Sequence, residues 1–161
     1  MRVAILTLSD SGYAGVRENK SGPAIRKLVE AAGYRVVYTA LLPDGMEPLA
    51  SELKRLCDGD IADLILTTGG TGFSPTDLTP EATRSVTERP APGIAEAMRY
   101  RSLQITPRAM LSRAAAGIRK RTLIVNLPGS PKAVRECLEY ALPALGHGLE
   151  ILRETAHNCA R

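Results

Sequence analysis

The residues best suited to chemistry form a glycine-rich stretch in the middle of the chain. Gly69-Gly70-Thr71-Gly72 directly follows a short apolar run, and Asp77 comes five residues after the last glycine. Three glycines in four residues allow positive φ and a close approach of backbone N–H groups to an anion. The stretch lacks the third glycine of the dinucleotide fingerprint and the Gly-Lys-Ser/Thr of a P-loop. It is therefore either another kind of phosphate-binding loop or a tight turn that only reverses the chain.

Three further polar loops follow predicted strands. They are Ser9-Asp10-Ser11-Gly12, Pro43-Asp44-Gly45 and Leu127-Pro128-Gly129-Ser130-Pro131. Ser, Asp and Gly are common in caps and turns, so none of these loops is specific by itself. The carboxyl ends of parallel strands meet at one edge of an α/β sheet, and ligands bind there. We therefore expect the four loops to converge on one site.

Other kinds of site lack the necessary residues. The two histidines, His147 and His157, have no HExxH or paired spacing, which argues against a zinc hydrolase and a Ser-His-Asp triad. One phenylalanine and no tryptophan argue against a stacking platform for nucleic acid. What remains is phosphate chemistry carried out by backbone amides, carboxylates and a metal.

Composition indicates one globular domain over residues 1–161. Hydrophobic residues make up 44% of the chain and charged residues 24%, and no apolar stretch approaches the ~20 residues of a membrane span. The run Val3–Leu8 lacks the basic lead-in and the cleavage site of a signal peptide. Three cysteines, odd in number and far apart, argue against a disulfide framework and favour a reducing cytoplasm.

The net charge of +4 is unevenly distributed. Nine basic residues and no acidic ones lie between Ala97 and Arg135, so the rest of the chain is acidic. The basic segment either binds an anionic ligand, with phosphate the leading candidate, or pairs with acids elsewhere in the fold.

Strands and helices are predicted to alternate. Strands are expected at Val3–Leu8, Tyr34–Leu42, Leu64–Thr67 and Leu123–Leu127. Helices are expected after Ser21, around Leu49 to Leu56, from Thr79, and from Val134 to Leu152, where Pro143 could cause a kink. This order implies right-handed crossovers and a parallel sheet covered by helices. Residues 93–118 stay open, because Ala114 to Ala116 favour a helix whereas Arg119-Lys120-Arg121 could join two strands in a hairpin.

Four blocks of sequence together resemble the molybdopterin adenylyltransferase family, the MogA/MoaB type, and the related G domains of gephyrin. The blocks are LLPD, TTGGTGFSPTDLTPEAT, ITPRAMLSRAAAGIR and TLIVNLPGSPKAVREC, and the resemblance runs from about Val3 to about Leu152. It implies a three-layer α/β/α fold with a mostly parallel central sheet and, in most members, a homotrimer. It also implies a nucleotidyltransferase of molybdenum cofactor biosynthesis, which uses ATP and Mg²⁺ to transfer AMP onto the terminal phosphate of molybdopterin and releases pyrophosphate.

The resemblance and the loop argument together nominate a set of site residues. Asp44 and Asp77 match family acids and are expected to be catalytic and to bind the metal. The expected substrate-binding residues are Ser9, Asp10, Gly69, Gly70, Thr71, Gly72, Ser112, Gly129 and Ser130. Two positions depart from the family pattern: Gly45 often corresponds to a second acid, which puts a two-carboxylate metal site at that loop in doubt, and Ser130 corresponds in some members to Asn.

The implied chemistry agrees with these residue types. A phosphate monoester is mostly ionised at pH 7, so it needs no histidine or cysteine to activate it. Mg²⁺ typically binds one or two carboxylates together with substrate phosphates, which suits Asp44 and Asp77.

Two rival functions stay open: a non-catalytic paralogue that binds pterin, and an oligomeric scaffold of the same fold. The presence of both Asp44 and Asp77 favours an enzyme. The expected partners are molybdopterin, ATP and further copies of the chain, with a possible hand-over of product to a molybdenum insertase. Neither nucleic acid nor membrane is expected as a partner.

Overall fold

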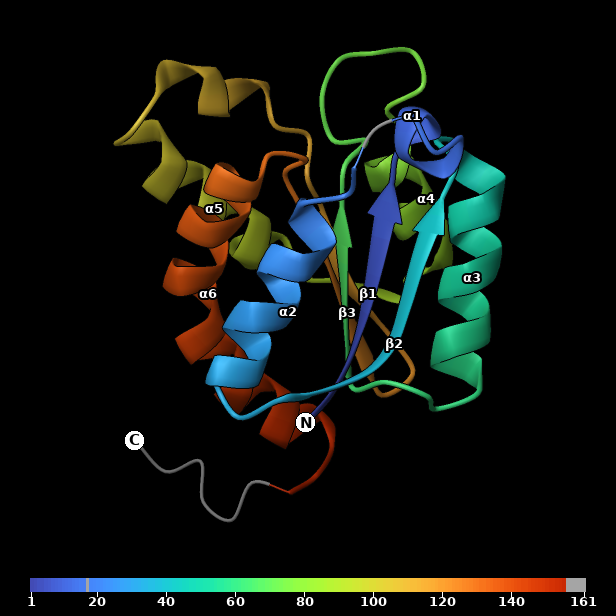
Figure 1. The fold of residues 1–161 in the computed structure, drawn as a ribbon. Helices are drawn as coiled ribbons and strands as arrows, with labels where there is room; N and C mark the ends of the chain where they lie inside the picture. Colours follow the sequence, from blue (N-terminus) through green and yellow to red (C-terminus); the bar gives the residue numbers. More distant parts are fainter. Residues whose placement is uncertain (17, 156–161) are drawn as a thin grey trace.

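The computed structural model describes residues 1–16 and 18–155. Within them, six strands form one sheet in the order β2-β1-β3-β6-β5-β4 (Figure 1). The strands are β1 (Arg2–Leu8), β2 (Arg35–Leu42), β3 (Leu64–Thr68), β4 (Arg89–Pro90), β5 (Ala116–Arg119) and β6 (Thr122–Leu127). β2, β1, β3 and β6 run parallel, and β5 is antiparallel to both β6 and β4. The sheet is therefore mostly parallel, as predicted.

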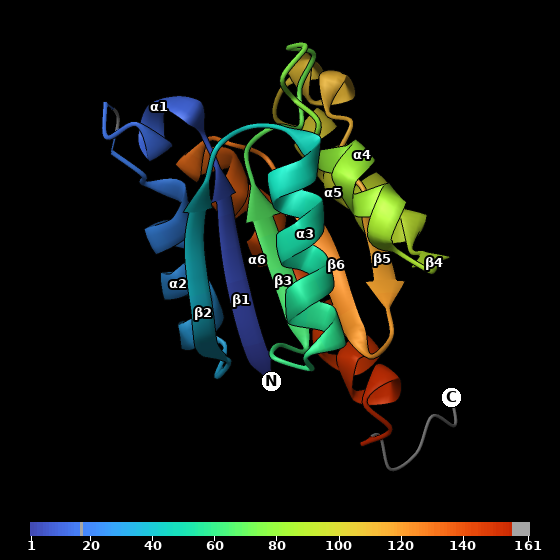
Figure 2. The same cartoon turned by 90° about the vertical axis from the view of Figure 1, so that its right-hand side faces the viewer.

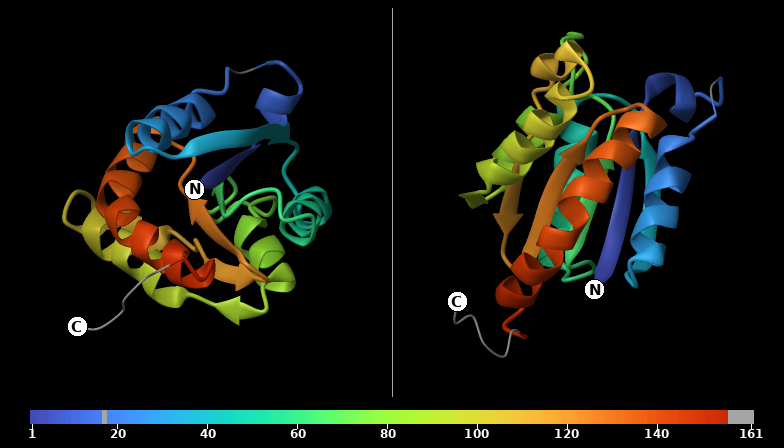
Figure 3. Two further views of the ribbon diagram at one scale, coloured as in Figure 1. Left: turned by 90° about the horizontal axis from the view of Figure 1, so that it is seen from below. Right: turned by 90° about the vertical axis from the view of Figure 1, so that its left-hand side faces the viewer.

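Helices cover both faces of this sheet. One face carries α2 (Ser21–Ala31), α5 (Pro92–Leu103) and α6 (Pro131–Leu152), which lie over the sheet in the right-hand view of Figure 3. The other face carries α3 (Met46–Asp58) and α4 (Thr79–Val86), with α3 in front of the sheet in Figure 2. A one-turn helix α1 (Asp10–Tyr13) and a 3₁₀ helix η1 (Pro107–Leu111) complete the described elements. The three-layer α/β/α prediction is confirmed.

The continuous apolar runs of the sequence explain the two cores. Along β1, Val3 and Ile5 pack among residues of α2 and α6, whereas Ala4 and Leu6 pack among residues of α3. Because a helical layer covers each face, the successive positions Val3 to Leu6 are all apolar instead of alternating with polar residues. Full burial of each large aliphatic side chain stabilises the fold by about 1.5–3 kcal/mol.

The segment that the sequence left open contains two helices and a strand. The helix alternative for Ala114 to Ala116 is wrong and the hairpin alternative is confirmed: Ala116 begins β5, which pairs with β6 through a turn at Lys120 and Arg121. Ala115 donates its backbone N–H to Asn126 Oδ1 at 3.1 Å. Pairing with β6 therefore overrides the helix propensity of alanine.

An ionic cluster lies at the amino-terminal end of the parallel strands. Asp63, directly before β3, accepts bonds from the backbone N–H of Arg2 at 2.7 Å and from the Arg2 guanidinium at 2.8 Å. Arg153, directly after α6, lies 3.3 Å from the same carboxylate. The cluster ties both ends of the fold to the sheet, at the opposite end from the polar loops. In the described part of the chain, no helix is long and apolar enough to cross a membrane.

Candidate functional site

Strand register brings the four polar loops together. Leu8 at the end of β1 pairs with Leu42 at the end of β2, and Thr68 of β3 pairs with Thr7 and Leu127 on its two sides. The four strands consequently end at one level, and their exit loops meet at the edge where α1 lies in Figure 1. Thr68 Oγ1 donates a hydrogen bond to the carbonyl of Pro128 at 2.7 Å, which joins the end of β3 directly to the loop that follows β6.

Glycine is required in the glycine loop, Gly69 to Gly72, which follows β3. Gly69 and Gly70 have φ of 98° and 64°, which disfavours other residues. A Cβ atom at Gly69 would overlap the carbonyl oxygen of Leu8, and one at Gly70 would overlap Thr79 Oγ1. A Cβ at Gly72 would lie 2.9 Å from Asp77 Oδ2. The loop is therefore packed closely against its neighbours, with more constraint than a simple chain reversal needs.

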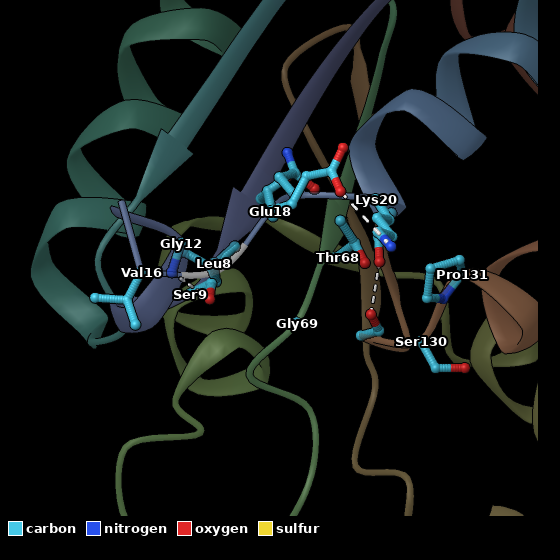
Figure 4. A pocket seen from close by; sticks show the side chains of 14 residues that line it. Leu8, Ser9, Gly12, Val16, Glu18, Lys20, Thr68, Gly69, Ser130 and Pro131 are labelled. Carbon is cyan, nitrogen blue, oxygen red and sulfur yellow. Dashed lines mark hydrogen bonds and ion pairs between the residues drawn. The ribbon is translucent and has the colours of Figure 1, made fainter. Parts of the chain in front are cut away.

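A cavity of about 670 Å³ opens between the loops that follow β1, β3 and β6. Figure 4 shows Ser9, Thr68, Gly69 and Ser130 around it, together with the Lys20–Glu18 ion pair of 3.6 Å. Four of the predicted substrate-binding residues line it: Ser9, Gly69, Gly129 and Ser130.

Two helix N-termini face the same cavity. Ser21 begins α2 and donates its hydroxyl to the carbonyl of Gly129 at 2.6 Å. Ser130 caps α6, its hydroxyl accepting the N–H of Ala133 at 3.1 Å. The free N–H groups and the positive dipole ends of these helices favour an anionic ligand, and Lys20 adds a positive charge. The larger cavity is therefore suited to phosphate groups.

A second cavity, of about 280 Å³, lies on the other side of the glycine loop. Its walls come from α5, η1 and α6 and include apolar side chains such as Met98 and Leu111. Thr71, Gly72 and Ser112, all predicted to bind substrate, line this cavity. Gly69 faces the larger cavity, so the glycine loop separates the two.

Three carboxylates lie beside the glycine loop. Asp44 Oδ2 accepts the backbone N–H of Asp10 at 3.0 Å, and Asp10 Oδ1 accepts the backbone N–H of Asp44 at 2.9 Å. Partial burial raises the pKa of Asp44, and the negative charges of Asp10 and Asp77 raise it further. Asp77 Oδ2 accepts the N–H of Ser74 at 3.0 Å and so closes the turn between these residues. None of the three lines either cavity.

The donor set of Asp44 and Asp77 fits Mg²⁺. Hard carboxylate oxygens are its preferred ligands, and a cation would relieve the repulsion from Asp10 and Asp77 that adds to the effect of burial on the pKa of Asp44. Within residues 1–16 and 18–155, no Lys or Arg forms an ion pair with Asp10, Asp44 or Asp77. The same residues hold no cluster of three or more His, Cys, Asp or Glu side chains able to bind a metal, so substrate phosphates would have to complete the coordination.

Part of the basic segment pairs with acids, one of the two alternatives that the sequence left open, whereas binding of an anionic ligand by this segment stays a prediction. Arg113 pairs with Glu81, while Arg119 and Lys120 pair with Asp58. Arg99 and Arg108 line the smaller cavity.

Several cavity residues were not predicted from sequence. Lys20, Ser21 and Thr68 line the larger cavity, and Ser102 lines the smaller one. Ser21 was interpreted only as part of a helix start. The orientation of that helix toward the sheet edge, which the strand order implies, was the available signal.

Comparison with known proteins identifies the family. A model described as "Probable molybdopterin binding domain" matches residues 4–147. The chain is 39% identical to a molybdopterin adenylyltransferase of Helicobacter pylori over 154 residues, which cover 94% of this chain and 88% of that protein. It is 41% identical to gephyrin of Dictyostelium discoideum over 160 residues, 93% of this chain but 22% of gephyrin. The crystal structure of the molybdopterin biosynthesis enzyme MoaB from Thermus thermophilus superposes with a TM-score of 0.90 at 48% identity, covering 95% of this chain and 96% of that one.

The fold is that of an α/β/α protein with two cavities at the carboxyl edge of its sheet. With these matches, the chain belongs to the molybdopterin adenylyltransferase family, the family that the sequence blocks resemble.

Proposed function

We propose that this protein transfers AMP from ATP to the terminal phosphate of molybdopterin and releases pyrophosphate. The observation that carries the proposal is the glycine loop between two cavities of different character. Adenylyl transfer requires that two phosphorylated molecules meet at their phosphate ends. A glycine-rich loop that lies between two cavities is suited to that junction, because its backbone can approach a phosphate closely.

The larger cavity is assigned to the nucleotide. Its polar walls, the N-termini of α2 and α6 and the side chain of Lys20 match a polyphosphate chain. Its volume of about 670 Å³ is within the usual range for ligand pockets and leaves room for a nucleoside as well.

The smaller cavity is assigned to the pterin. Apolar walls suit a flat heterocycle, and hydroxyl and carboxylate side chains supply hydrogen bonds to its polar edge. The polar side chains that line it include Ser102, Ser112 and Glu136. The phosphate of the pterin would then point toward Thr71 and Gly72.

The reaction needs positioning more than proton transfer. An oxygen of the pterin phosphate attacks the α-phosphorus of ATP, the new P–O bond replaces the bond to the β-phosphate, and pyrophosphate leaves with the electron pair. Asp44 and Asp77 would hold Mg²⁺, which neutralises charge on the phosphates when it is bound. The loop N–H groups orient the attacking phosphate, and Asp10 keeps Asp44 in place through the paired backbone bonds.

Assembly and location are part of the proposal. A trimer is implied by the family, and exposed apolar side chains on α5 and η1, such as Tyr100 and Met110, supply a surface that assembly could cover. A cytoplasmic location is supported by Cys57 and Cys137, which are both free thiols. Hand-over of the adenylated product to a molybdenum insertase follows from the proposed chemistry.

The test measures which product receives the α-phosphate of ATP and which receives the γ-phosphate. Protein, Mg²⁺ and molybdopterin are incubated with ATP labelled on the α-phosphate or, separately, on the γ-phosphate. The proposal predicts α-label in the pterin product and γ-label in pyrophosphate. Binding of both ligands without transfer of label would instead support a non-catalytic pterin-binding protein, and binding of neither would support a scaffold.

A further inference from the structure

One side chain holds both ends of the segment between Gly72 and Asp77. Arg113 Nε donates a hydrogen bond to the carbonyl of Gly72 at 2.7 Å, and Arg113 Nη2 donates to the carbonyl of Asp77. The backbone N–H of Arg113 also donates to the carbonyl of Thr71 at 3.0 Å. The distance between the glycine loop and Asp77 is therefore fixed across a single guanidinium group.

The segment has little other support along its length. Residues 73–76 are exposed, and the side chain of Phe73 is 68% exposed. Ser74 and Asp77 bond to each other, which closes a local turn but does not attach it to the rest of the fold. A bond from Thr79 N–H to the carbonyl of Gly70, 3.1 Å long, anchors the base of the loop. Contact between Arg113 and the two carbonyls is thus the main restraint on the turn itself.

Glu81 of α4 holds the guanidinium in this position. Arg113 Nη1 lies 2.5 Å from Glu81 Oε1. Burial opposes ionisation of Glu81, but the Arg113 guanidinium outweighs it and keeps the pKa of this carboxyl below its ordinary value. All three guanidinium nitrogens of Arg113 are therefore engaged, in three directions. Only a planar group with donors in a fixed fork can make this arrangement, and the single ammonium of lysine cannot.

Arg113 also adjoins the smaller cavity. It directly follows Ser112, which lines that cavity, and its main chain bonds to Thr71, which lines it too. We propose that Arg113 is a positioning residue that sets Gly72 and Asp77 in the geometry needed for adenylyl transfer, an inference that rests on the proposed function. Arg113 does not touch the reacting atoms in this account. It acts through the backbone of the loop.

The chain offers a direct reporter of loop position and a matched control. The protein contains no tryptophan, so Phe73→Trp places a single indole fluorophore on the segment. Arg84 serves as control, because its Nη1 lies 3.8 Å from the same Glu81 carboxylate. Its side chain is 59% exposed, and no bond joins it to the described loop residues. Arg113→Lys and Arg84→Lys are each made in the Phe73→Trp background and in the native chain.

The loop measurement does not depend on activity. We expect Arg113→Lys to lower the fluorescence anisotropy of Trp at position 73 and to raise its quenching by acrylamide, while Arg84→Lys changes neither. Unchanged anisotropy and quenching in Arg113→Lys would overturn the positioning role, whatever reaction the protein catalyses.

The activity measurement separates positioning from folding. With ATP and molybdopterin, we expect Arg113→Lys to lower kcat by about 30-fold or more, because small misplacements of reacting groups are costly. KM for ATP should stay within about threefold, since the nucleotide cavity lies on the other side of the loop. Added guanidinium ion should restore part of kcat to a folded Arg113→Ala variant, whereas methylammonium should not.

Three results of the activity measurement would overturn the inference. They are native kcat in Arg113→Lys, an equal loss of kcat in Arg84→Lys, and a loss in Arg113→Ala that methylammonium restores as well as guanidinium does. If the native protein transfers no AMP but Arg113→Lys still loosens the loop, the proposed function fails, and only the structural part of the inference, that Arg113 restrains the loop, stands.

Discussion

Asp10 and Asp44 each accept the other's backbone N–H group, at 2.9 and 3.0 Å respectively. The exit loops of β1 and β2 are thereby joined by two reciprocal bonds, and two carboxylates are held close together. Each carboxylate accepts a backbone N–H, but no Lys or Arg of residues 1–16 and 18–155 forms an ion pair with either. Repulsion between these two carboxylates opposes folding at the point where a metal and phosphates are proposed to bind.

Asp44→Asn tests whether the charge of Asp44 lowers stability in the absence of metal and is needed for binding of ATP with Mg²⁺. The raised pKa of Asp44 means that the folded protein binds its proton more tightly than the unfolded chain, so this group favours folding at low pH and opposes it as pH rises through the folded pKa. Asparagine removes the charge and keeps an oxygen that accepts the Asp10 N–H. We expect an equal or higher melting temperature near pH 7 without metal, and loss of the extra stabilisation that ATP with Mg²⁺ gives the native protein. Equal stabilisation of both proteins by ATP with Mg²⁺ would exclude Asp44 as a ligand.

Gly70→Ala tests the strict need for glycine. The backbone at Gly70 has φ of 64°, and the new methyl group would overlap Thr79 Oγ1. We expect a loss of about 1–3 kcal/mol in unfolding free energy, which lowers the melting temperature by several degrees. Gly148→Ala is the control: it lies within α6 with nothing near its Cβ position, and it should stabilise the protein by about 0.5–1 kcal/mol. Equal melting temperatures for the two variants would contradict the loop geometry.

Lys20→Gln tests the assignment of the larger cavity. Lys20 lies at its mouth and pairs only with the exposed Glu18 in the described chain, so the fold gains little from this charge. We expect affinity for ATP to fall by about tenfold, the effect of one lost charge-assisted bond, with an unchanged melting temperature and unchanged affinity for molybdopterin. Weaker binding of molybdopterin with native binding of ATP would reverse the assignment of the two cavities.

Asp63→Ala tests the ionic cluster at the far end of the sheet. The Asp63 side chain is 8% exposed, and its loss would leave Arg2 and Arg153 with only the more exposed Asp60 as a shared carboxylate. We expect a loss of about 3 kcal/mol in unfolding free energy, but kcat per folded molecule should be native. Burial opposes ionisation of Asp63 and the Arg2 bonds outweigh it, so its pKa lies below the ordinary 3.8.

The sign of that shift gives a second readout. A lowered pKa contributes stability that is complete above pH 4 and is lost as pH falls through the folded pKa. The native protein should therefore lose stability below pH 4 more steeply than Asp63→Ala does. Glu30→Gln, which removes the exposed pair with Arg26, should change unfolding free energy by less than about 0.5 kcal/mol. Parallel acid unfolding of native protein and Asp63→Ala would contradict the role of the cluster.

The layers of the fold could be predicted because its parallel strands are buried on both faces. Val3–Leu8 and Leu123–Leu127 are apolar except for Thr7 and Asn126, and polar loops follow both. β5 could not be predicted in the same way. Its four residues have no strand pattern of their own, and they are extended because β6 pairs with them and Asn126 holds the preceding Ala115. Such pairing is a property of the folded chain.

The site was predictable in part for a similar reason. Topology alone placed Ser9, Gly69 and Ser130 at one edge, and they line one cavity. That the glycine loop would separate this cavity from a second one depends on how α5 and η1 pack, which the sequence did not indicate. The Arg113 contacts were equally hidden, because carbonyl acceptors occur at every residue and leave no signal in the sequence.

Asp77→Asn provides the most direct test of the central claim, that this site transfers AMP with the help of Asp77. Asparagine can still accept the Ser74 N–H through its side-chain oxygen, so the turn and the melting temperature should be retained. The measurement is pyrophosphate released per protein molecule in a single turnover with ATP, Mg²⁺ and molybdopterin. We expect one equivalent from the native protein, none when molybdopterin is left out, and a rate in Asp77→Asn lower by about 100-fold or more, equal to about 2.7 kcal/mol of transition-state stabilisation. Release that does not require molybdopterin, or a folded Asp77→Asn variant with the native rate, would contradict the account.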